Sequence, residues 1–229
     1  MQDTINGVAP KRTYGDACGV ARALDLIGER WALLVVRELL LGPKRFTDLT
    51  TGVPGMSPNV LSQRLRELEE AGIVQRRKLG PPASNRVYDL TERGAELEPV
   101  LIAIARWGSR APMTSSAELS TDALILALRT TFDADMAVTL AARYELRLGD
   151  DRFHLDVADG RFDVGRFAVG RGAAEQPDAI LGTDAATLRA LVFRGRRLDD
   201  AERAGDVTVT GDRDAVAHLL RCFPRPTPA

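Results

Sequence analysis

Hydrophobic residues recur every three or four positions through most of the first half of the chain, which is the spacing of an amphipathic helix. This pattern predicts four helices, at residues 17–27, 31–41, 57–71 and 91–108, with a short helical turn at 46–49. Gly42-Pro43 ends the second helix, and Ser57-Pro58 supplies an N-cap and a first helical residue for the third. Two short runs, IVQRRKL and RVYDL, then flank GPPASN and predict a β-hairpin.

Apolar and polar positions alternate in the second half, and this alternation predicts strands. It runs from Val138 to Leu148 and continues at 153–157, 162–164, 179–181 and 207–209, with an Asp159-Gly160 turn. Helical patterns occupy 120–131, 184–193 and 212–222. Antiparallel strands with helices grouped around them predict an α+β fold.

The segment at 111–119 is small, polar and contains Pro, so we expect it to link two domains. The expected division is a first domain at 1–110, the linker, a second domain at 120–223 and a disordered tail at 224–229. Charge supports two units, since residues 1–114 hold 16 basic and 13 acidic side chains and residues 115–229 hold 15 and 19. The two units are therefore expected to have different partners.

Composition excludes several classes of protein. The chain of 229 residues is 45% hydrophobic and 28% charged, which are ordinary globular values. No apolar run approaches the roughly 20 residues of a membrane span, and the start lacks the apolar core of a secretory signal. With Cys18 and Cys222 as its cysteines and two histidines, the chain offers no disulfide framework or zinc-ligand pattern. We expect a cytoplasmic protein.

Enzyme motifs are also missing from the sequence. It contains no phosphate-binding Gly-x-x-x-x-Gly-Lys loop, no Gly-x-Ser-x-Gly nucleophile elbow and no His-Glu-x-x-His zinc motif. We therefore expect a protein that is not an enzyme and that uses no cofactor or metal.

The helix at 57–71 carries the strongest functional signal. At about 100° per residue, one side gathers Val60, Leu61, Leu65, Leu68 and Ala71, and the opposite side gathers Asn59, Ser62, Gln63 and Arg66. The amide and guanidinium groups match base edges in a DNA major groove. The alternative is an ordinary solvated helix face. Arg64 falls on the apolar side, which indicates a structural or phosphate-clamping role.

Basic residues on both sides of this helix favour double-stranded DNA as the partner. A polar helix with flanking basic sites and a hairpin predicts a winged helix-turn-helix. The predicted DNA contacts are Lys44, Arg45, Ser57, Asn59, Ser62, Gln63, Arg64, Arg66, Arg76, Arg77, Lys78, Asn85 and Arg86.

Residues 14–110 resemble the HxlR family of bacterial transcription regulators. The resemblance rests on the cysteine at 18, Gly-x-x-Trp at 28–31, Gly-Pro-Lys-Arg-Phe at 42–46, Leu-x-x-Arg-Leu at 61–65 and Tyr-x-Leu-Thr at 88–91. It implies a homodimer on an inverted-repeat operator, paired through the helices at 17–27 and 91–108. Cys18 matches a cysteine that senses oxidants in some members. A buried structural thiol is the alternative, and the nearby Asp16 disfavours a reactive thiolate.

Residues 120–223 resemble the sterol carrier protein fold in the order of the Asp-Gly turn, a short strand, a helix ending in Gly and the run Gly-Asp-Val-Thr-Val-Thr-Gly-Asp. The resemblance implies an apolar tunnel for a lipid-like effector. Its candidate lining is Phe162, Phe167, Leu188, Val192, Phe193 and Leu219. The alternative is that these residues are packed core. We therefore expect a DNA-binding regulator modulated by an apolar ligand, or a redox-responsive regulator acting through Cys18 with the second domain as an interaction module.

Overall fold

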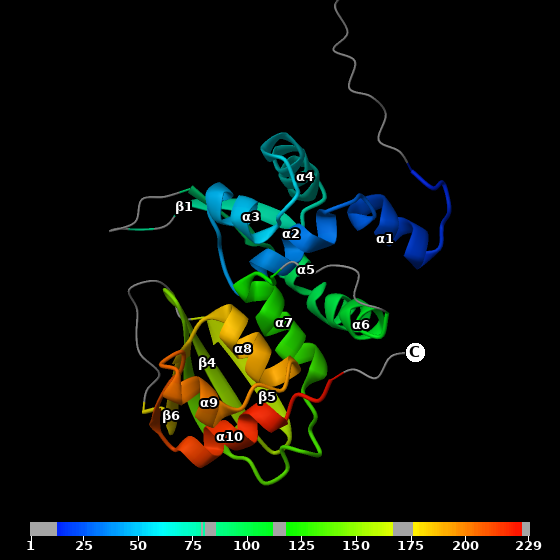
Figure 1. Ribbon diagram of the computed structural model, residues 1–229. Helices are drawn as coiled ribbons and strands as arrows, with labels where there is room; N and C mark the ends of the chain where they lie inside the picture. The colour runs from blue at the N-terminus through cyan, green and yellow to red at the C-terminus, as the bar shows by residue number, and fades with distance from the viewer. Residues whose placement is uncertain (1–12, 79, 81–85, 112–117, 167–175, 226–229) are drawn as a thin grey trace, which may run out of the picture.

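Two lobes follow each other along the chain in the computed structural model (Figure 1), which describes residues 13–78, 80, 86–111, 118–166 and 176–225. The first lobe contains α1 (Gly19–Ile27), α2 (Ala32–Leu39), α3 (Phe46–Gly52), α4 (Pro58–Glu70), β1 (Val74–Lys78), β2 (Arg86–Leu90), α5 (Glu92–Ala95) and α6 (Glu98–Gly108). The second contains α7 (Thr121–Thr131), β3 (Ala142–Leu148), β4 (Asp151–Ala158), β5 (Arg161–Arg166), β6 (Ala179–Thr183), α8 (Ala185–Phe193), α9 (Leu198–Arg203), β7 (Thr208–Gly211) and α10 (Arg213–Arg221). The α+β fold class is confirmed.

The first lobe packs around α2, whose Val35 and Val36 are fully buried. The inner face of α4 meets them with Leu61, Leu65 and Leu68, so the predicted apolar side of this helix is its core side, except at Val60, which is 37% exposed. Ser57 is the N-cap, and its hydroxyl accepts a hydrogen bond from the Val60 amide at 3.4 Å. Strands β1 and β2 form the predicted antiparallel hairpin.

The predicted helix at 91–108 is two helices in the structure. Thr91 caps α5, and α6 begins again at Glu98 with Pro99 in its first turn. Proline has no backbone N–H and disfavours helical geometry in the residue before it, so it fits a helix start and not a helix interior. Position 94 in α5 requires glycine, because a Cβ there would stand 2.1 Å from the Ile73 carbonyl oxygen.

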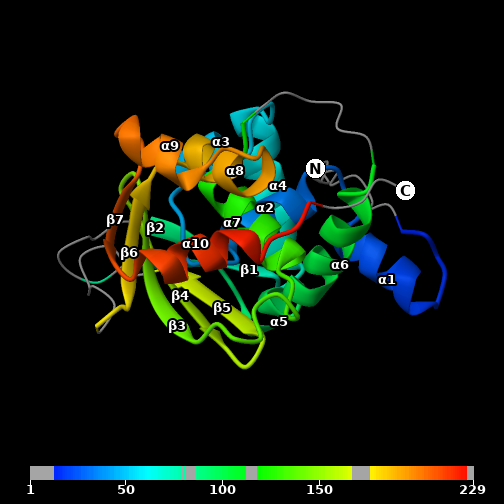
Figure 2. The ribbon, with the colours of Figure 1, turned by 60° about the horizontal axis from the view of Figure 1, so that its bottom comes forward.

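The second lobe is a five-stranded sheet in the order β5-β4-β3-β6-β7. Helices α8, α9 and α10 lie together on one side of it (Figure 2). The expectation of antiparallel strands throughout was wrong at one pair, since β6 runs parallel to β3. After β5, at one edge of the sheet, the chain crosses over and adds β6 on the other side of β3. The alternation of apolar and polar residues predicts a strand but carries no information on such a crossover.

The alternation from Val138 predicted one long strand or two short ones, and the structure has one strand that begins only at Ala142. Ahead of it, the Asp133 carboxylate accepts hydrogen bonds from the amides of Asp135 and Met136 at 2.9 and 3.2 Å. This side-chain turn directs residues 134–139 away from extended geometry. Val138 is consequently 69% exposed although its position fits the alternation.

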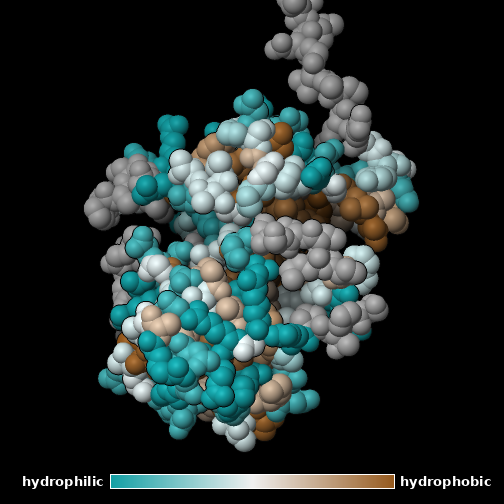
Figure 3. Space-filling view, viewed as in Figure 1, coloured by the Kyte–Doolittle hydropathy of each residue, from teal (hydrophilic) through white to brown (hydrophobic). Residues whose placement is uncertain are grey.

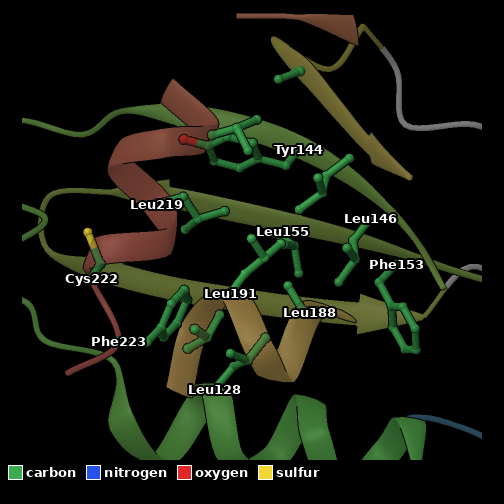
Figure 4. Close-up of a cluster of buried hydrophobic side chains, with 14 of the residues drawn as sticks. Leu128, Tyr144, Leu146, Phe153, Leu155, Leu188, Leu191, Leu219, Cys222 and Phe223 are labelled. Atoms are coloured by element: carbon green, nitrogen blue, oxygen red, sulfur yellow. The ribbon is translucent and has the colours of Figure 1, made fainter. Parts of the chain in front are cut away.

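The core of the second lobe lies between the sheet and its helices (Figure 4), where Leu188, Leu191 and Leu219 meet the inward side chains of β3 and β4. The Tyr144 hydroxyl, inside this core, donates a hydrogen bond to the Ala215 carbonyl oxygen at 3.1 Å. Burial raises the pKa of Tyr144 well above its ordinary value. Among the described residues, no helix is long and apolar enough to cross a membrane.

Candidate nucleic-acid interface

Helix α4 presents its polar side to solvent. Asn59, Ser62, Gln63 and Arg66 are all exposed, and α4 stands at the far side of the first lobe from the second (Figure 1). Gln63 donates a hydrogen bond to the Glu67 carboxylate at 2.9 Å, one turn along the same helix. The acidic second lobe therefore leaves this side of α4 accessible to a partner.

Arg64 behaves differently from its neighbours on α4. Its side chain is 11% exposed and its guanidinium forms ion pairs with Glu67 and, at 3.4 Å, with Glu29 just after α1. Such a group ties α4 to the end of α1. Of the two roles expected for Arg64, this placement agrees with the structural one.

The hairpin carries cations along both strands. Arg76 pairs with Glu69 of α4 at 2.8 Å and lies 5.5 Å from the centre of the Tyr88 ring, while Arg77 pairs with Asp89. Lys78 and Arg86 are exposed and directly opposite each other in the register. Like charges opposite each other destabilise a strand pair, and a bound anion relieves that repulsion. Asn85 lies outside the described residues.

Lys44, a predicted DNA contact, is buried in the structure. Lys44 is 8% exposed, and its amine lies 2.7 Å from Glu38 Oε2 and 2.5 Å from Asp122 Oδ2. An amine held by two carboxylates is not a free phosphate ligand, so the predicted contact of Lys44 with DNA is wrong. Its neighbour Arg45 is exposed and is the N-cap residue of α3.

The buried carboxylates of Glu38 and Asp122 were missed in the sequence. A signal was present for Glu38, because it interrupts an otherwise apolar helix and a buried charge needs a partner. Nothing in the sequence identifies Asp122, because it pairs with Lys44 from 78 residues further along the chain.

The two cysteines have opposite surroundings. Cys18 is exposed and is the N-cap of α1, where its sulfur accepts a hydrogen bond from the Ala21 amide at 3.3 Å and its own amide donates to Asp16. Cys222 is fully buried in the core of the second lobe, and burial raises the pKa of its thiol. A raised pKa keeps the Cys222 thiol protonated and unreactive.

A second exposed surface of the first lobe is apolar. Its members lie on α1 and α6 and include Val20 (70% exposed), Ile104 (46%) and Trp107 (79%). An open groove of about 650 Å³ runs between α1 and the α5–α6 segment, with Leu26, Ile27 and Leu97 in its lining. Hydrophobic surface beside α1 is visible in Figure 3.

The predicted tunnel residues are mostly packed core. Leu188, Val192 and Leu219 are at most 8% exposed and belong to one hydrophobic cluster. Phe162 stacks on Phe132 with ring centres 5.0 Å apart, Phe193 is partly buried against the same cluster, and Phe167 lies outside the described residues. Two hollows of the described residues, beside α1 and between α2 and α7, lie away from these candidate lining residues.

Comparison with known families divides the chain in two. Residues 26–116 match the model of the HxlR-like helix-turn-helix family, and residues 111–229 match the alkyl sulfatase C-terminal family. The sterol-carrier resemblance of the second half is not confirmed by these matches. Residues matched to the second family make up about half of the chain.

Individual relatives agree with the first match. An uncharacterised HTH-type transcriptional regulator of Synechocystis, sll1512, is 43% identical over 96 residues, which are 42% of this chain and 70% of that protein. The HTH-type transcriptional regulator YodB of Bacillus subtilis is 38% identical over 88 residues, or 38% of this chain and 79% of YodB. Its quinone-bound crystal structure superposes on 40% of this chain and 97% of YodB with a TM-score of 0.35, at 35% identity.

Part of this chain superposes on part of a larger solved structure. The inverting sec-alkylsulfatase Pisa1 of Pseudomonas is 19% identical, with a TM-score of 0.43 over 48% of this chain and 17% of the enzyme. The chain belongs, through its first lobe, to the HxlR family of helix-turn-helix transcriptional regulators and, through its second, to the alkyl sulfatase C-terminal family.

Proposed function

We propose that this transcriptional regulator binds an inverted-repeat operator as a homodimer, with α4 of each protomer in the major groove and the β1–β2 hairpin on the adjacent phosphates. The observation that carries the proposal is the exposed polar side of α4, formed by Asn59, Ser62, Gln63 and Arg66. Amide side chains suit adenine and guanidinium suits guanine, so this side can read sequence.

The hairpin and α3 supply the contacts that do not depend on sequence. Arg45, Arg76, Arg77, Lys78 and Arg86 are exposed and able to reach phosphates. Arg76 and Arg77 already pair with Glu69 and Asp89. Both arginine side chains are 55% exposed, so a phosphate can reach them while these pairs are in place.

Pairing through α1 and α6 is the proposed dimer contact. Their exposed apolar side chains, Trp107 above all, lose water contact only if another surface covers them. A two-fold contact repeats the same surface on both protomers and sets two recognition helices about 34–36 Å apart, one turn of DNA. The proposed cytoplasmic location follows from this function.

DNA binding is tested by selecting bound fragments from genomic DNA and comparing two variants on the fragments recovered. Arg66→Ala should weaken specific binding and relax one base preference, whereas Arg77→Ala should weaken binding to all sequences and lower the salt dependence by about one phosphate. Equal effects of both variants on base preference would contradict the division of roles between α4 and the hairpin.

The second lobe is proposed to act as an interaction module without catalytic activity. Its candidate tunnel residues Leu188, Val192 and Leu219 fill the space between helices and sheet, so an apolar effector would have to displace packed side chains. Sulfate release from a secondary alkyl sulfate should stay at the level of a protein-free blank. Turnover above that blank would contradict this part of the proposal.

Control by thiol oxidation is a second candidate function. Cys18 is exposed and begins α1, the helix that carries part of the proposed dimer contact. YodB, a relative of the first lobe, has been solved in quinone-bound and diamide-treated forms. Diamide should change the DNA affinity of the wild type and of Cys222→Ser, and leave Cys18→Ser unchanged. An equal response of wild type and Cys18→Ser would exclude Cys18 as the sensor.

A further inference from the structure

A buried ionic cluster joins the two lobes. Glu38 of α2, Lys44 and Asp122 of α7 are 0%, 8% and 2% exposed, and the Lys44 amine contacts both carboxylates. The Ser120 hydroxyl adds a hydrogen bond from the second lobe to Glu38 Oε1 at 2.7 Å. Arg37 holds the same Glu38 oxygen at 2.8 Å.

Among the described residues, the charges of these ion pairs balance only when the second lobe takes part. Lys44 and Arg37 supply two positive charges, and Glu38 and Asp122 supply two negative ones. Breaking a buried pair is costly because it leaves an uncompensated charge.

Lys44 is also part of the hairpin through its backbone. Its amide donates to the Tyr88 carbonyl oxygen at 2.9 Å, and the Tyr88 amide donates to the Lys44 carbonyl oxygen at 2.8 Å. The hairpin thereby gains a third backbone segment along β2. The Tyr88 ring faces Arg76, which in turn pairs with Glu69 of α4.

Other contacts hold α7 in a constant position against the first lobe. Arg129 of α7 pairs with Glu98 of α6, and Leu41, just after α2, packs on the hydrophobic cluster of the second lobe. Helix α7 also packs against both α2 and α6. Asp122 is therefore presented to Lys44 by a helix that is itself fixed at several points.

We propose that Asp122, in the second lobe, is a positioning residue for DNA binding. It holds the Lys44 amine, and through the Lys44 backbone it fixes the hairpin and the start of α3 relative to α4. The inference rests on the proposed function and deepens it, because the second lobe becomes a structural part of the DNA-binding unit and not a tethered neighbour. A partner that moves α7 would thus act directly on the hairpin.

The binding test compares Asp122→Asn with the control Asp214→Asn, which removes an exposed carboxylate from the same first-turn position of α10. Binding of each variant to a 30-base-pair duplex is measured by fluorescence anisotropy from about 0.05 to 0.3 M salt. Each phosphate contact contributes roughly fivefold in affinity at 0.15 M salt. If one or two hairpin contacts are lost, affinity should fall about 5- to 30-fold and the salt slope by about 0.9–1.8. Asp214→Asn should match the wild type.

A double variant separates positioning from simple loss of stability. Lys44→Met/Asp122→Asn contains no unpaired buried charge at this site, so we expect it to fold even if Asp122→Asn does not. If Asp122 acts through Lys44, the double variant should bind DNA as weakly as Lys44→Met alone. Wild-type affinity and salt slope in the double variant would overturn the proposal.

Hydrogen exchange measures the same effect without DNA. In Asp122→Asn, the amides of Lys44 and Tyr88 should exchange faster than in the wild type, while amides of α10 should not change. Unchanged exchange at Lys44 and Tyr88 would overturn the proposal. If the wild type binds no duplex at low salt but these two amides still respond, the proposed function fails and the positioning of the hairpin by Asp122 stands.

Discussion

Substituting Gly52 tests how tightly the buried ionic cluster is built. Gly52 is the last residue of α3, and a Cβ at this position would stand 2.2 Å from Glu38 Oε2 and 2.7 Å from Glu38 Cδ. The side chain of Glu38 is not free to retreat, because Lys44, Ser120 and Arg37 all bind its carboxylate. Gly52→Ala must therefore displace the carboxylate from at least one of these partners.

The expected change in the free energy of unfolding is the balance of two opposing effects. Losing one charge-assisted hydrogen bond costs about 1.5–3 kcal/mol, and leaving Lys44 partly unpaired in a buried site raises the total toward 3–5 kcal/mol. Helix propensity acts the other way, since alanine is favoured over glycine by about 1 kcal/mol. We expect Gly52→Ala to lower the free energy of unfolding by about 2–4 kcal/mol. At this chain length that corresponds to a fall in Tm of about 4–16 °C.

Thermal unfolding followed by intrinsic fluorescence measures this change. The control is Gly108→Ala at the end of α6, where an added Cβ meets nothing within 4 Å, so its Tm should stay level or rise slightly. If Gly52→Ala is as stable as Gly108→Ala, the Glu38 carboxylate has room to move. The account of a close-packed ionic cluster would then be wrong.

Two further predictions concern the apolar surface and the buried tyrosine. Trp107→Glu should shift sedimentation from dimer to monomer and weaken operator binding, because it sets a charge in the proposed apolar contact, and a monomeric wild type would contradict this. Tyr144→Phe should cost about 0.5–1.5 kcal/mol through the lost hydrogen bond to Ala215. The folded protein keeps the Tyr144 proton while the unfolded chain loses it above pH 10, so this group's stability contribution is complete below pH 10 and is lost as pH rises further. The difference in unfolding free energy between wild type and Tyr144→Phe should therefore shrink from pH 9 to pH 11, and a constant difference would argue against the raised pKa.

Local patterns were reliable where the determining interactions lie within a few residues. The hairpin at β1–β2 and the N-cap Ser57 are both confirmed. Each depends on neighbouring residues, such as a side-chain oxygen accepting from an amide three positions ahead. Only the expected start of the strand at Val138 was wrong, because the Asp133 carboxylate provides a competing local hydrogen-bonding pattern.

The amino-acid sequence by itself determined which side of α4 faces outward, because the apolar residues of one helix must turn together toward the core. It also determined the family of the first lobe, through motifs that are contiguous in the chain. Only the tertiary structure decided the role of Lys44 and the parallel pairing of β6 with β3. Both depend on groups that lie far apart in the chain. The buried amine of Lys44 pairs with a second carboxylate from the other lobe, because an unpaired charge buried between the lobes would be unstable.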